Sequence, residues 1–159
     1  MSENHWPSVR EIYLAGIASG NATFETEAPE WDEWHAKHLR FARLVAVVDG
    51  EVKGWAALSG VSTRKVYCGV AENSVYVAPA AQGLGLGRLL LERLIAESDA
   101  NGIWTLQNSI FPENVASIRL HRSCGFREVG YRERVGQLND VWRNTIFMER
   151  RSTVVGTDS

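Results

Sequence analysis

The chain has 159 residues, of which 45% are apolar and 23% charged, a balance typical of a globular protein. Its 17 basic and 19 acidic side chains give a net charge of −2, which argues against nucleic-acid binding through bulk positive charge. This length predicts one domain over residues 1–159, with a loose tail from about residue 151.

We expect no membrane partner, because no apolar run approaches the ~20 residues that span a bilayer. The N-terminus lacks the basic start and the apolar core of a signal peptide. The two cysteines, Cys68 and Cys124, cannot form a disulfide framework and indicate reduced thiols. The cytoplasm is therefore the expected location.

Hydrophobic spacing at three and four residues predicts a first helix from Ser8 to a stop near Ser19-Gly20. A second helix is predicted from Pro29 to about Phe41, after an irregular segment or short strand over Asn21–Thr26. Asp49-Gly50 is a strong hairpin turn. Further strands are predicted over residues 44–48, 52–58, 69–77, 105–110, 127–135 and 142–150, helices over 86–100 and 115–123, and loops over 60–65 and 136–140. This order predicts an α/β (α+β) domain with a mostly antiparallel sheet.

The most informative stretch is SVYVAPAAQGLGLGRLLL over residues 74–91, in which a strand, a turn and three glycines lead into a helix. Glycine lets the backbone approach a ligand closely, and the first N–H groups of a helix are unpaired and partly positive. Together they predict an anion site suited to pyrophosphate. Arg88, in the first turn, can add a charged contact.

Known phosphate-binding motifs narrow this prediction. The spacing of Gly83, Gly85 and Gly87 fails the G-x-G-x-x-G rule of dinucleotide-binding folds, and no Gly-Lys-Ser/Thr of a P-loop follows. What remains is Gln82-x-x-Gly85-x-Gly87 between a strand and a helix. A ligand-free turn is the alternative, although a turn does not need three glycines.

This motif resembles the acetyl-CoA loop of the GNAT N-acetyltransferase superfamily, and NVASIRLHRSCGF over residues 114–126 resembles its second CoA segment. More narrowly, the chain resembles the phosphinothricin acetyltransferase family over roughly residues 9–149. The shared segments are Ile12-Tyr13, Asn21–Thr26, Pro29 to Trp34, Val45-Ala46, Gly50–Val52, Glu72–Val77, Gln82–Gly87, Asn114–Phe126 and Trp142-Arg143.

The resemblance implies a GNAT fold, with a central sheet whose two middle strands splay apart around the pantetheine arm of acetyl-CoA. The cofactor-binding residues it implies are Val75, Tyr76 and Val77 beside the pantetheine, Gln82, Gly83, Leu84, Gly85, Leu86, Gly87 and Arg88 around the pyrophosphate, and Asn114 near the sulfur. A homodimer is the family expectation.

Acetyl transfer to an amine requires removal of a proton, polarisation of the thioester carbonyl and stabilisation of the leaving thiolate. The resemblance assigns the base to Glu72 and the polarising group to the backbone N–H near Val77. It assigns the leaving sulfur to His121, for which packing on the sheet is the alternative. The alternative for Glu72 is a solvated strand glutamate. We expect no metal, since His35 and His38 lack a third ligand.

The resemblance places Phe24, Glu25, Arg64, Tyr67 and Trp142 at the acceptor, where an arginine can hold a carboxylate bidentately. Exposed loop charge is the alternative for the arginine, and core or dimer packing for the tryptophan.

Several positions depart from the family pattern. Ser62 stands where a second basic residue is common, Val70-Ala71 replaces Thr-Val, Asn144 replaces a hairpin aspartate, and the family's first strand is largely absent.

The resemblance implies an acetyl-CoA-dependent N-acetyltransferase that acts on the α-amine of a small amino acid analogue, such as phosphinothricin, methionine sulfoximine, methionine sulfone or arsinothricin. Resistance or detoxification is the expected role. Two alternatives stay open. The first is a GNAT enzyme for another amine, where an acidic cleft would favour a polyamine and an open groove a peptide N-terminus. The second is a non-catalytic acyl-CoA-binding module.

Overall fold

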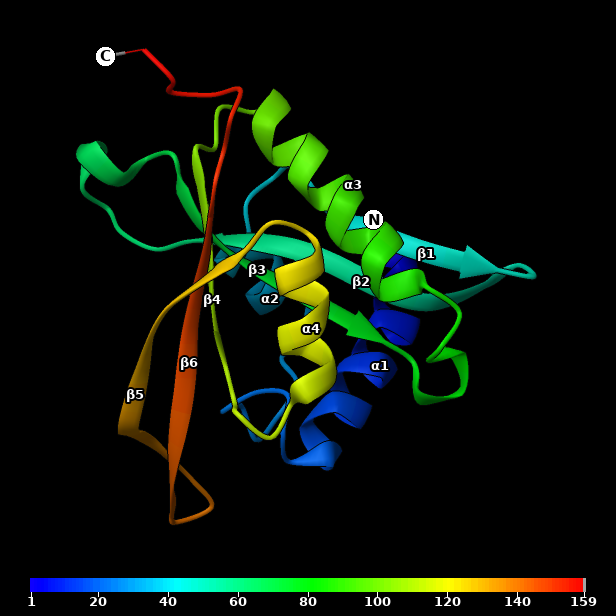
Figure 1. The fold of residues 1–159 in the computed structure, drawn as a ribbon. Helices are drawn as coiled ribbons and strands as arrows, with labels where there is room; N and C mark the ends of the chain where they lie inside the picture. The colour runs from blue at the N-terminus through cyan, green and yellow to red at the C-terminus, as the bar shows by residue number, and fades with distance from the viewer. Residues whose placement is uncertain (159) are drawn as a thin grey trace.

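One six-stranded sheet in the order β1-β2-β3-β4-β6-β5 carries the helices of this protein, which is described here over residues 1–158 of a computed structural model (Figure 1). The helices are α1 (Trp6–Ser19), α2 (Trp31–Lys37), α3 (Leu86–Ala100) and α4 (Val115–Ser123), with short 3-10 turns η1 (Glu3–His5), η2 (Lys65–Tyr67) and η3 (Pro79–Ala81). The strands are β1 (Leu44–Val48), β2 (Glu51–Gly60), β3 (Val70–Val77), β4 (Thr105–Ile110), β5 (Arg127–Leu138) and β6 (Val141–Arg151).

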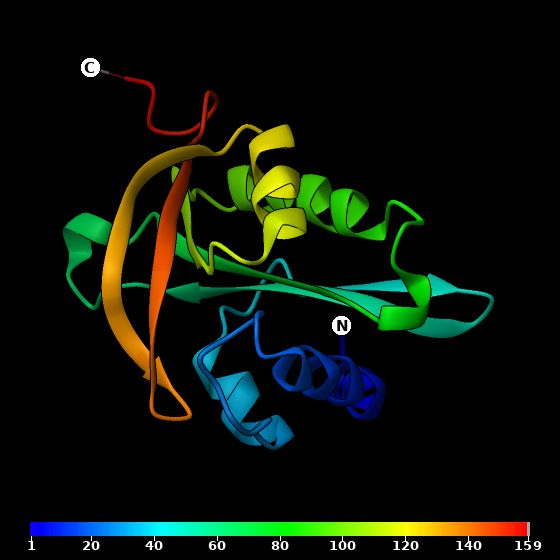
Figure 2. The ribbon, with the colours of Figure 1, turned by 60° about the horizontal axis from the view of Figure 1, so that its bottom comes forward.

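The helices cover both faces of the sheet: α1 and α2 lie on one face, α3 and α4 on the other (Figure 2). Successive side chains of strand β2 point to opposite faces of the sheet, and because helices cover both faces, the strand is buried on both sides. Trp55 packs with Trp6 and Trp34 under α1 and α2, whereas Leu58 packs with Leu91 of α3. We call the face under α1 and α2 the acceptor face.

The two middle strands separate along their length. β3 pairs with β2 from Val77 down to Ala71, but with β4, in parallel, only over Val70–Glu72. Beyond Glu72 the two strands diverge (Figure 1). The splayed sheet expected from the family resemblance is therefore present, and it opens a gap beside the last part of β3.

Most predicted elements are confirmed, and the bounds of β1, α3, β4 and α4 match the prediction. The second helix is shorter than predicted and ends at Lys37, because His38 is extended (φ −105°, ψ 148°). Here the Arg43 guanidinium donates to the backbone oxygens of His35 and His38 at 2.9 Å, which satisfies carbonyls that a longer helix would have used.

In the middle of the chain β2 extends over Glu51–Gly60 and β3 begins at Val70, and the larger differences lie at the two ends of the chain. The first helix begins at Trp6 rather than Ser8, and within residues 1–158 no strand precedes it. The final hairpin is longer than predicted: instead of a loop over 136–140, a tight turn at Asn139-Asp140 joins β5 to β6, with φ of 49° and 64°. Among the helices of residues 1–158, none has the length and apolar character needed to cross a membrane.

Candidate active site

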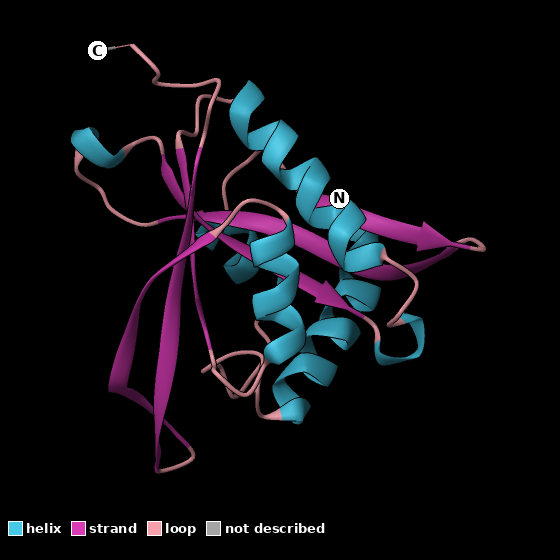
Figure 3. Ribbon diagram, in the orientation of Figure 1, coloured by secondary structure: helices cyan, strands magenta, loops and turns pink. Residues whose placement is uncertain are grey.

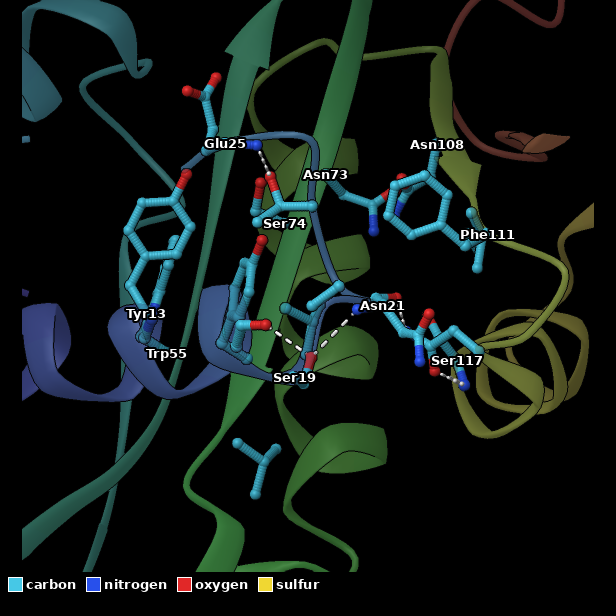
Figure 4. Close-up of a pocket in the computed structure, with 18 of the residues that line it drawn as sticks. Tyr13, Ser19, Asn21, Glu25, Trp55, Asn73, Ser74, Asn108, Phe111 and Ser117 are labelled. Atoms are coloured by element: carbon cyan, nitrogen blue, oxygen red, sulfur yellow. Dashed lines mark hydrogen bonds between the residues drawn. The ribbon is translucent and has the colours of Figure 1, made fainter. Parts of the chain in front are cut away.

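An open groove of about 1940 Å³ occupies the gap where β3 leaves β4. Its walls come from α1, the connection between α1 and α2, β3, the start of α3, the end of β4, α4 and the β5–β6 hairpin. Figure 4 shows Tyr13 and Trp55 on one side of this groove and Asn108, Phe111 and Ser117 on the other. Segments that are far apart in sequence thus meet around one cavity.

Residues 82–88, which we call the glycine loop, form the end of the groove nearest α3. Gly83 and Gly85 have left-handed backbones, with φ of 82° and 78°, and a Cβ at either position would meet no atom within 4 Å. The left-handed backbone, rather than packing, therefore favours glycine at both positions. Gly85 caps α3, whose first N–H groups are suited to an anion. This open cradle fits the pyrophosphate of CoA.

Gly87 lines the groove, as predicted for a cofactor-binding residue, and also has a packing role. It has ordinary helical backbone, and a Cβ there would come within 3.2 Å of Leu120 on α4 and 3.8 Å of Val77. This glycine lets α3 approach α4 and β3 closely. Of the three glycines, it is the one that protein packing explains.

The other predicted residues of the glycine loop do not all line the groove. Gln82, Leu86 and Arg88 line the groove, but Leu84 does not and is exposed. The Arg88 guanidinium is held 2.7 Å from Glu92, one turn further along α3, in an exposed ion pair. Such a pair is weak, so Arg88 can exchange it for a phosphate.

The end of β3 presents its residues to both faces. Val75 and Val77 pack towards the core under α3 and α4, while Tyr76 lies on the acceptor face, stacked on Trp55 with ring centroids 4.8 Å apart. Burial raises the pKa of the Tyr76 hydroxyl well above its ordinary value. All three predicted residues line the groove. The backbone of Tyr76 faces β2, so the backbone of Val75 and Val77, on either side of it, faces the gap and is left to contact a cofactor.

Asn114 lines the groove and also holds the local structure together. Its Oδ1 accepts from the backbone N–H of Ser117 at 3.2 Å and caps α4, and its Nδ2 donates to the Asn21 carbonyl at 3.1 Å. The residue thereby ties α4 to the connection between α1 and α2, which Figure 3 draws as a pink loop.

Glu72 is the last residue of β3 that is paired with β4, opposite Gln107, and its side chain lines the groove. Residues two apart on a strand share a face, so Glu72 lies on the acceptor face with Tyr76. Its carboxylate has no ion-pair partner among residues 1–158. Glu72 is exposed to the groove, and the partial desolvation there raises its pKa. A carboxylate with a raised pKa is a stronger base for an amine proton.

His121 is buried, with 1% of its surface exposed, and both ring nitrogens are engaged. Nδ1 lies 2.7 Å from the Ser117 carbonyl and must donate, while Nε2 lies 2.9 Å from the Asn73 amide nitrogen and 3.3 Å from that of Asn108, and accepts. Burial lowers the pKa of the imidazole. In this arrangement the ring is neutral and has no N–H left for a leaving sulfur.

Of the five predicted acceptor residues, the structure brings two to the groove. Phe24 lines it and packs edge-on against Phe111 with centroids 4.8 Å apart, and Glu25 lines it beside Tyr13. The other three, Arg64, Tyr67 and Trp142, do not line the groove.

These three residues lie on segments that extend away from it. Arg64 lies over the Tyr67 ring, 5.4 Å from its centroid, on the segment around η2 that projects from the sheet (Figure 3). Trp142 lies at the far end of the hairpin and is 55% exposed.

Several groove residues were missed by sequence reasoning. Tyr13 and Asn73 were noticed only as helix and strand residues, and Arg132 and Thr145 only as parts of the last hairpin. What these four residues share is their position around the gap between β3 and β4, which depends on the register in which the strands pair. The sequence alone does not provide this pairing. His38, by contrast, stacks on Trp34 at 4.1 Å, and residues 1–158 hold no cluster of three or more His, Cys, Asp or Glu side chains suited to a metal.

The known proteins that this chain resembles are acetyltransferases. Residues 6–126 match the acetyltransferase (GNAT) family. The chain is 35% identical to the phosphinothricin N-acetyltransferase of Alcaligenes faecalis, covering 91% of this chain and 76% of that protein. It is 38% identical to an L-methionine sulfoximine/L-methionine sulfone acetyltransferase of Pseudomonas aeruginosa, covering 90% and 87%. The phosphinothricin acetyltransferase of Sinorhizobium meliloti, solved in complex with acetyl-CoA, superposes with a TM-score of 0.89 at 28% identity, covering 100% of this chain and 89% of that one.

Proposed function

Because the chain belongs to the GNAT acetyltransferase family, we propose that it transfers an acetyl group from acetyl-CoA to the α-amine of a small amino acid analogue of the phosphinothricin or methionine sulfoximine type. The family resemblance drawn from the sequence motifs is confirmed, and so is the GNAT fold. The names of the relatives support this acceptor class. Acetylation removes the positive charge of the amine, which supports a role in resistance or detoxification.

One observation carries this proposal: an unpaired carboxylate, that of Glu72, lies at the point where β3 and β4 separate. The gap beside Val75–Val77 suits the pantetheine arm, and the glycine loop suits the pyrophosphate. Glu72 would then border the place where the thioester lies. This is where an incoming amine must lose its proton.

In the proposed mechanism, Glu72 accepts a proton from the ammonium group of the acceptor, directly or through water. The nitrogen lone pair attacks the thioester carbon, and the backbone N–H near Val77 stabilises the negative charge that forms on the carbonyl oxygen. The carbon–sulfur bond then breaks, the thiolate leaves and takes up the second proton that the nitrogen loses, and Glu72 returns the first proton to solvent. The products are an N-acetyl amino acid and CoA.

For His121, the geometry favours a positioning role, in which the neutral ring holds the Asn73 and Asn108 amides. Asn73 follows Glu72 on β3, so this hydrogen-bond network fixes the backbone that carries the base. Phe24 and Glu25 are proposed to contact the acceptor.

An amine panel tests the acceptor class. The purified protein is incubated with acetyl-CoA and phosphinothricin, methionine sulfoximine, methionine sulfone, a polyamine or a peptide, and free thiol is measured. We expect release of CoA with the first three. Glu25, Glu27, Glu30 and Glu33 border the groove, and this acidic rim is the observation that favours a polyamine instead. Turnover with the polyamine alone would replace the proposal, and acetyl-CoA binding without any turnover would indicate a binding module.

The raised pKa of Glu72 predicts the pH dependence. Only the deprotonated carboxylate can accept a proton, so kcat/KM should fall as the pH drops through the pKa of Glu72. Since desolvation raises that pKa, the acidic limb should lie above the ordinary glutamate range. A pH profile of kcat/KM from about pH 3.5 to 9 measures it. An acidic limb at or below the ordinary glutamate pKa would contradict this assignment.

We further propose a cytoplasmic homodimer. Trp142 and Val141 are 55% and 60% exposed at the end of the β5–β6 hairpin, an apolar pair that a second copy can cover. Analytical ultracentrifugation should give a mass near twice the 17.7 kDa of one chain. Sedimentation as a monomer at micromolar concentration would refute the dimer.

A further inference from the structure

Arg132 and Thr145 lie on the same face of the sheet as Glu72, as the strand register shows. Glu72 pairs with Gln107, which pairs with Glu149 on β6, and paired residues point to the same face. Thr145 is four residues from Glu149 on β6 and so shares its face, and Thr145 pairs with Arg132 on β5. The acceptor face therefore continues from the base across β4 and β6 to Arg132.

Both residues line the groove with unused polar atoms. Thr145 is only 1% exposed, and its hydroxyl has no hydrogen-bond partner among residues 1–158. A buried hydroxyl without a partner is unfavourable unless something else binds it. Three lysines and arginines line the groove: Lys37 is paired with Glu33, Arg88 is paired with Glu92, and Arg132 has no carboxylate partner in the described chain.

A bulge in β5 brings this part of the hairpin against the groove. Between the pairs Arg132–Thr145 and Gly136–Arg143, β5 carries residues 133–135 opposite Asn144 alone. The backbone of Arg134 is left-handed (φ 48°), and its N–H donates to Asn144 Oδ1 at 2.8 Å, which stabilises the bulge. Gly136 then packs under Phe24, where a Cβ would approach the ring to 3.0 Å. The bulge thus links Arg132 to the acceptor residue Phe24.

We propose that the Arg132 guanidinium and the Thr145 hydroxyl bind an oxyanion of the acceptor, namely its α-carboxylate or the anionic group of its side chain. A guanidinium binds such a group with two parallel hydrogen bonds, and the hydroxyl donates a third. In the proposed mechanism Glu72 lies at the ammonium end of the acceptor, and Arg132 suits its anionic end. This inference rests on the proposed function and gives the carboxylate-binding role expected of Arg64 to a residue that lines the groove.

The test compares Arg132→Gln with Arg134→Gln, which removes the same charge from the same bulge at a position that does not line the groove. KM and kcat are measured with phosphinothricin, which has two anionic groups, with methionine sulfone, which has only the α-carboxylate, and with methionine sulfone carboxamide, which has none. We expect Arg132→Gln to raise KM roughly tenfold to a hundredfold for an anionic acceptor, and Arg134→Gln to have no effect.

The three acceptors distinguish the two anions. An increase in KM for phosphinothricin alone identifies the side-chain anion as the bound group. An increase for both phosphinothricin and methionine sulfone identifies the α-carboxylate. In either case, Arg132→Gln should leave the KM for the carboxamide unchanged. Equal KM values for the two arginine variants with every acceptor would overturn the proposal.

Thr145→Val supplies a second readout. It removes a hydroxyl that has no protein partner and keeps the shape of the side chain, so the melting temperature should stay the same or rise while KM for the anionic acceptor increases. A merely structural hydroxyl would show the opposite: a lower melting temperature and an unchanged KM.

Calorimetry separates a failure of this inference from a failure of the proposed function. Phosphinothricin is titrated into the CoA-bound wild type, Arg132→Gln and Arg134→Gln proteins. If no amine is acetylated but phosphinothricin binds and Arg132→Gln weakens it, the oxyanion site stands without the reaction. If phosphinothricin does not bind the wild type, both proposals fail.

Discussion

Replacing Glu72 with glutamine is expected to lower kcat/KM for the amine by about 10²–10⁴-fold while acetyl-CoA binding stays unchanged. Glutamine keeps the shape of the side chain but cannot accept the proton of the ammonium group. Glu72 lies on the acceptor face at the end of the β3–β4 pairing, away from the glycine loop that would hold the pyrophosphate. Steady-state kinetics and calorimetry with acetyl-CoA measure the two quantities separately.

Glu133→Gln is the matched control, since Glu133 is also a strand glutamate but does not line the groove. It should leave kcat/KM within about threefold of the wild type, as surface substitutions usually do. An equal loss in both variants, or a Glu72→Gln enzyme that keeps its activity, would remove Glu72 from the mechanism.

The stability of the Glu72→Gln protein gives an independent check. The pKa of Glu72 is raised in the folded state, so the stability that this group contributes is present below its unfolded pKa and is lost as the pH rises through the folded pKa. At neutral pH the ionised carboxylate therefore disfavours the folded protein. Glutamine removes this charge, and the melting temperature at pH 7 should be unchanged or higher. Lost activity with retained stability is the signature of a functional residue.

The elements that the sequence predicted correctly are those whose bounds are set by residues close to them in the chain. The glycine motif that leads into α3 is a local signal, and the helices over 86–100 and 115–123 were predicted to the residue. The end of α2 was missed because it is set by Arg43, whose guanidinium binds carbonyls that no short-range pattern reveals. The final hairpin was cut short because two non-glycine residues, Asn139 and Asp140, form its turn.

The candidate site also has one part that local motifs predict and another part that depends on residues far apart in the sequence. The glycine loop and Glu72 belong to contiguous motifs and were predicted together with the splay between them. The acceptor side depends on which strands become neighbours. Thr145 and Arg132 reach the groove only because β6 and β5 follow β4 in the sheet, and Arg64 and Tyr67 miss it because their segment projects away. Strand order is a long-range property, so the acceptor side could not be read from motifs.

The double variant Gly83→Ala/Gly85→Ala is expected to weaken acetyl-CoA binding by about 100-fold. Each alanine must either adopt a left-handed backbone, at a cost of about 1–2 kcal/mol, or distort the glycine loop. Where the loop distorts in the free protein, binding must restore the left-handed backbone at both positions, and the two costs together correspond to a factor of roughly 30 to 1,000 in affinity. In addition, each Cβ would enter open space that faces the groove, where the pyrophosphate is proposed to lie. Calorimetric titration with acetyl-CoA gives the affinity, and thermal unfolding gives the stability.

Gly50→Ala/Gly102→Ala is the control that separates backbone strain from lost binding. These glycines have φ of 81° and 78°, and a Cβ on either would also meet nothing within 4 Å, but neither lines the groove. Both double variants should therefore lose a similar amount of stability, since the strain is the same in kind and number. Only the variant in the glycine loop should lose affinity for acetyl-CoA. If the two variants bound acetyl-CoA equally well, the left-handed glycines would serve the turn alone, and the pyrophosphate would have to bind elsewhere along α3.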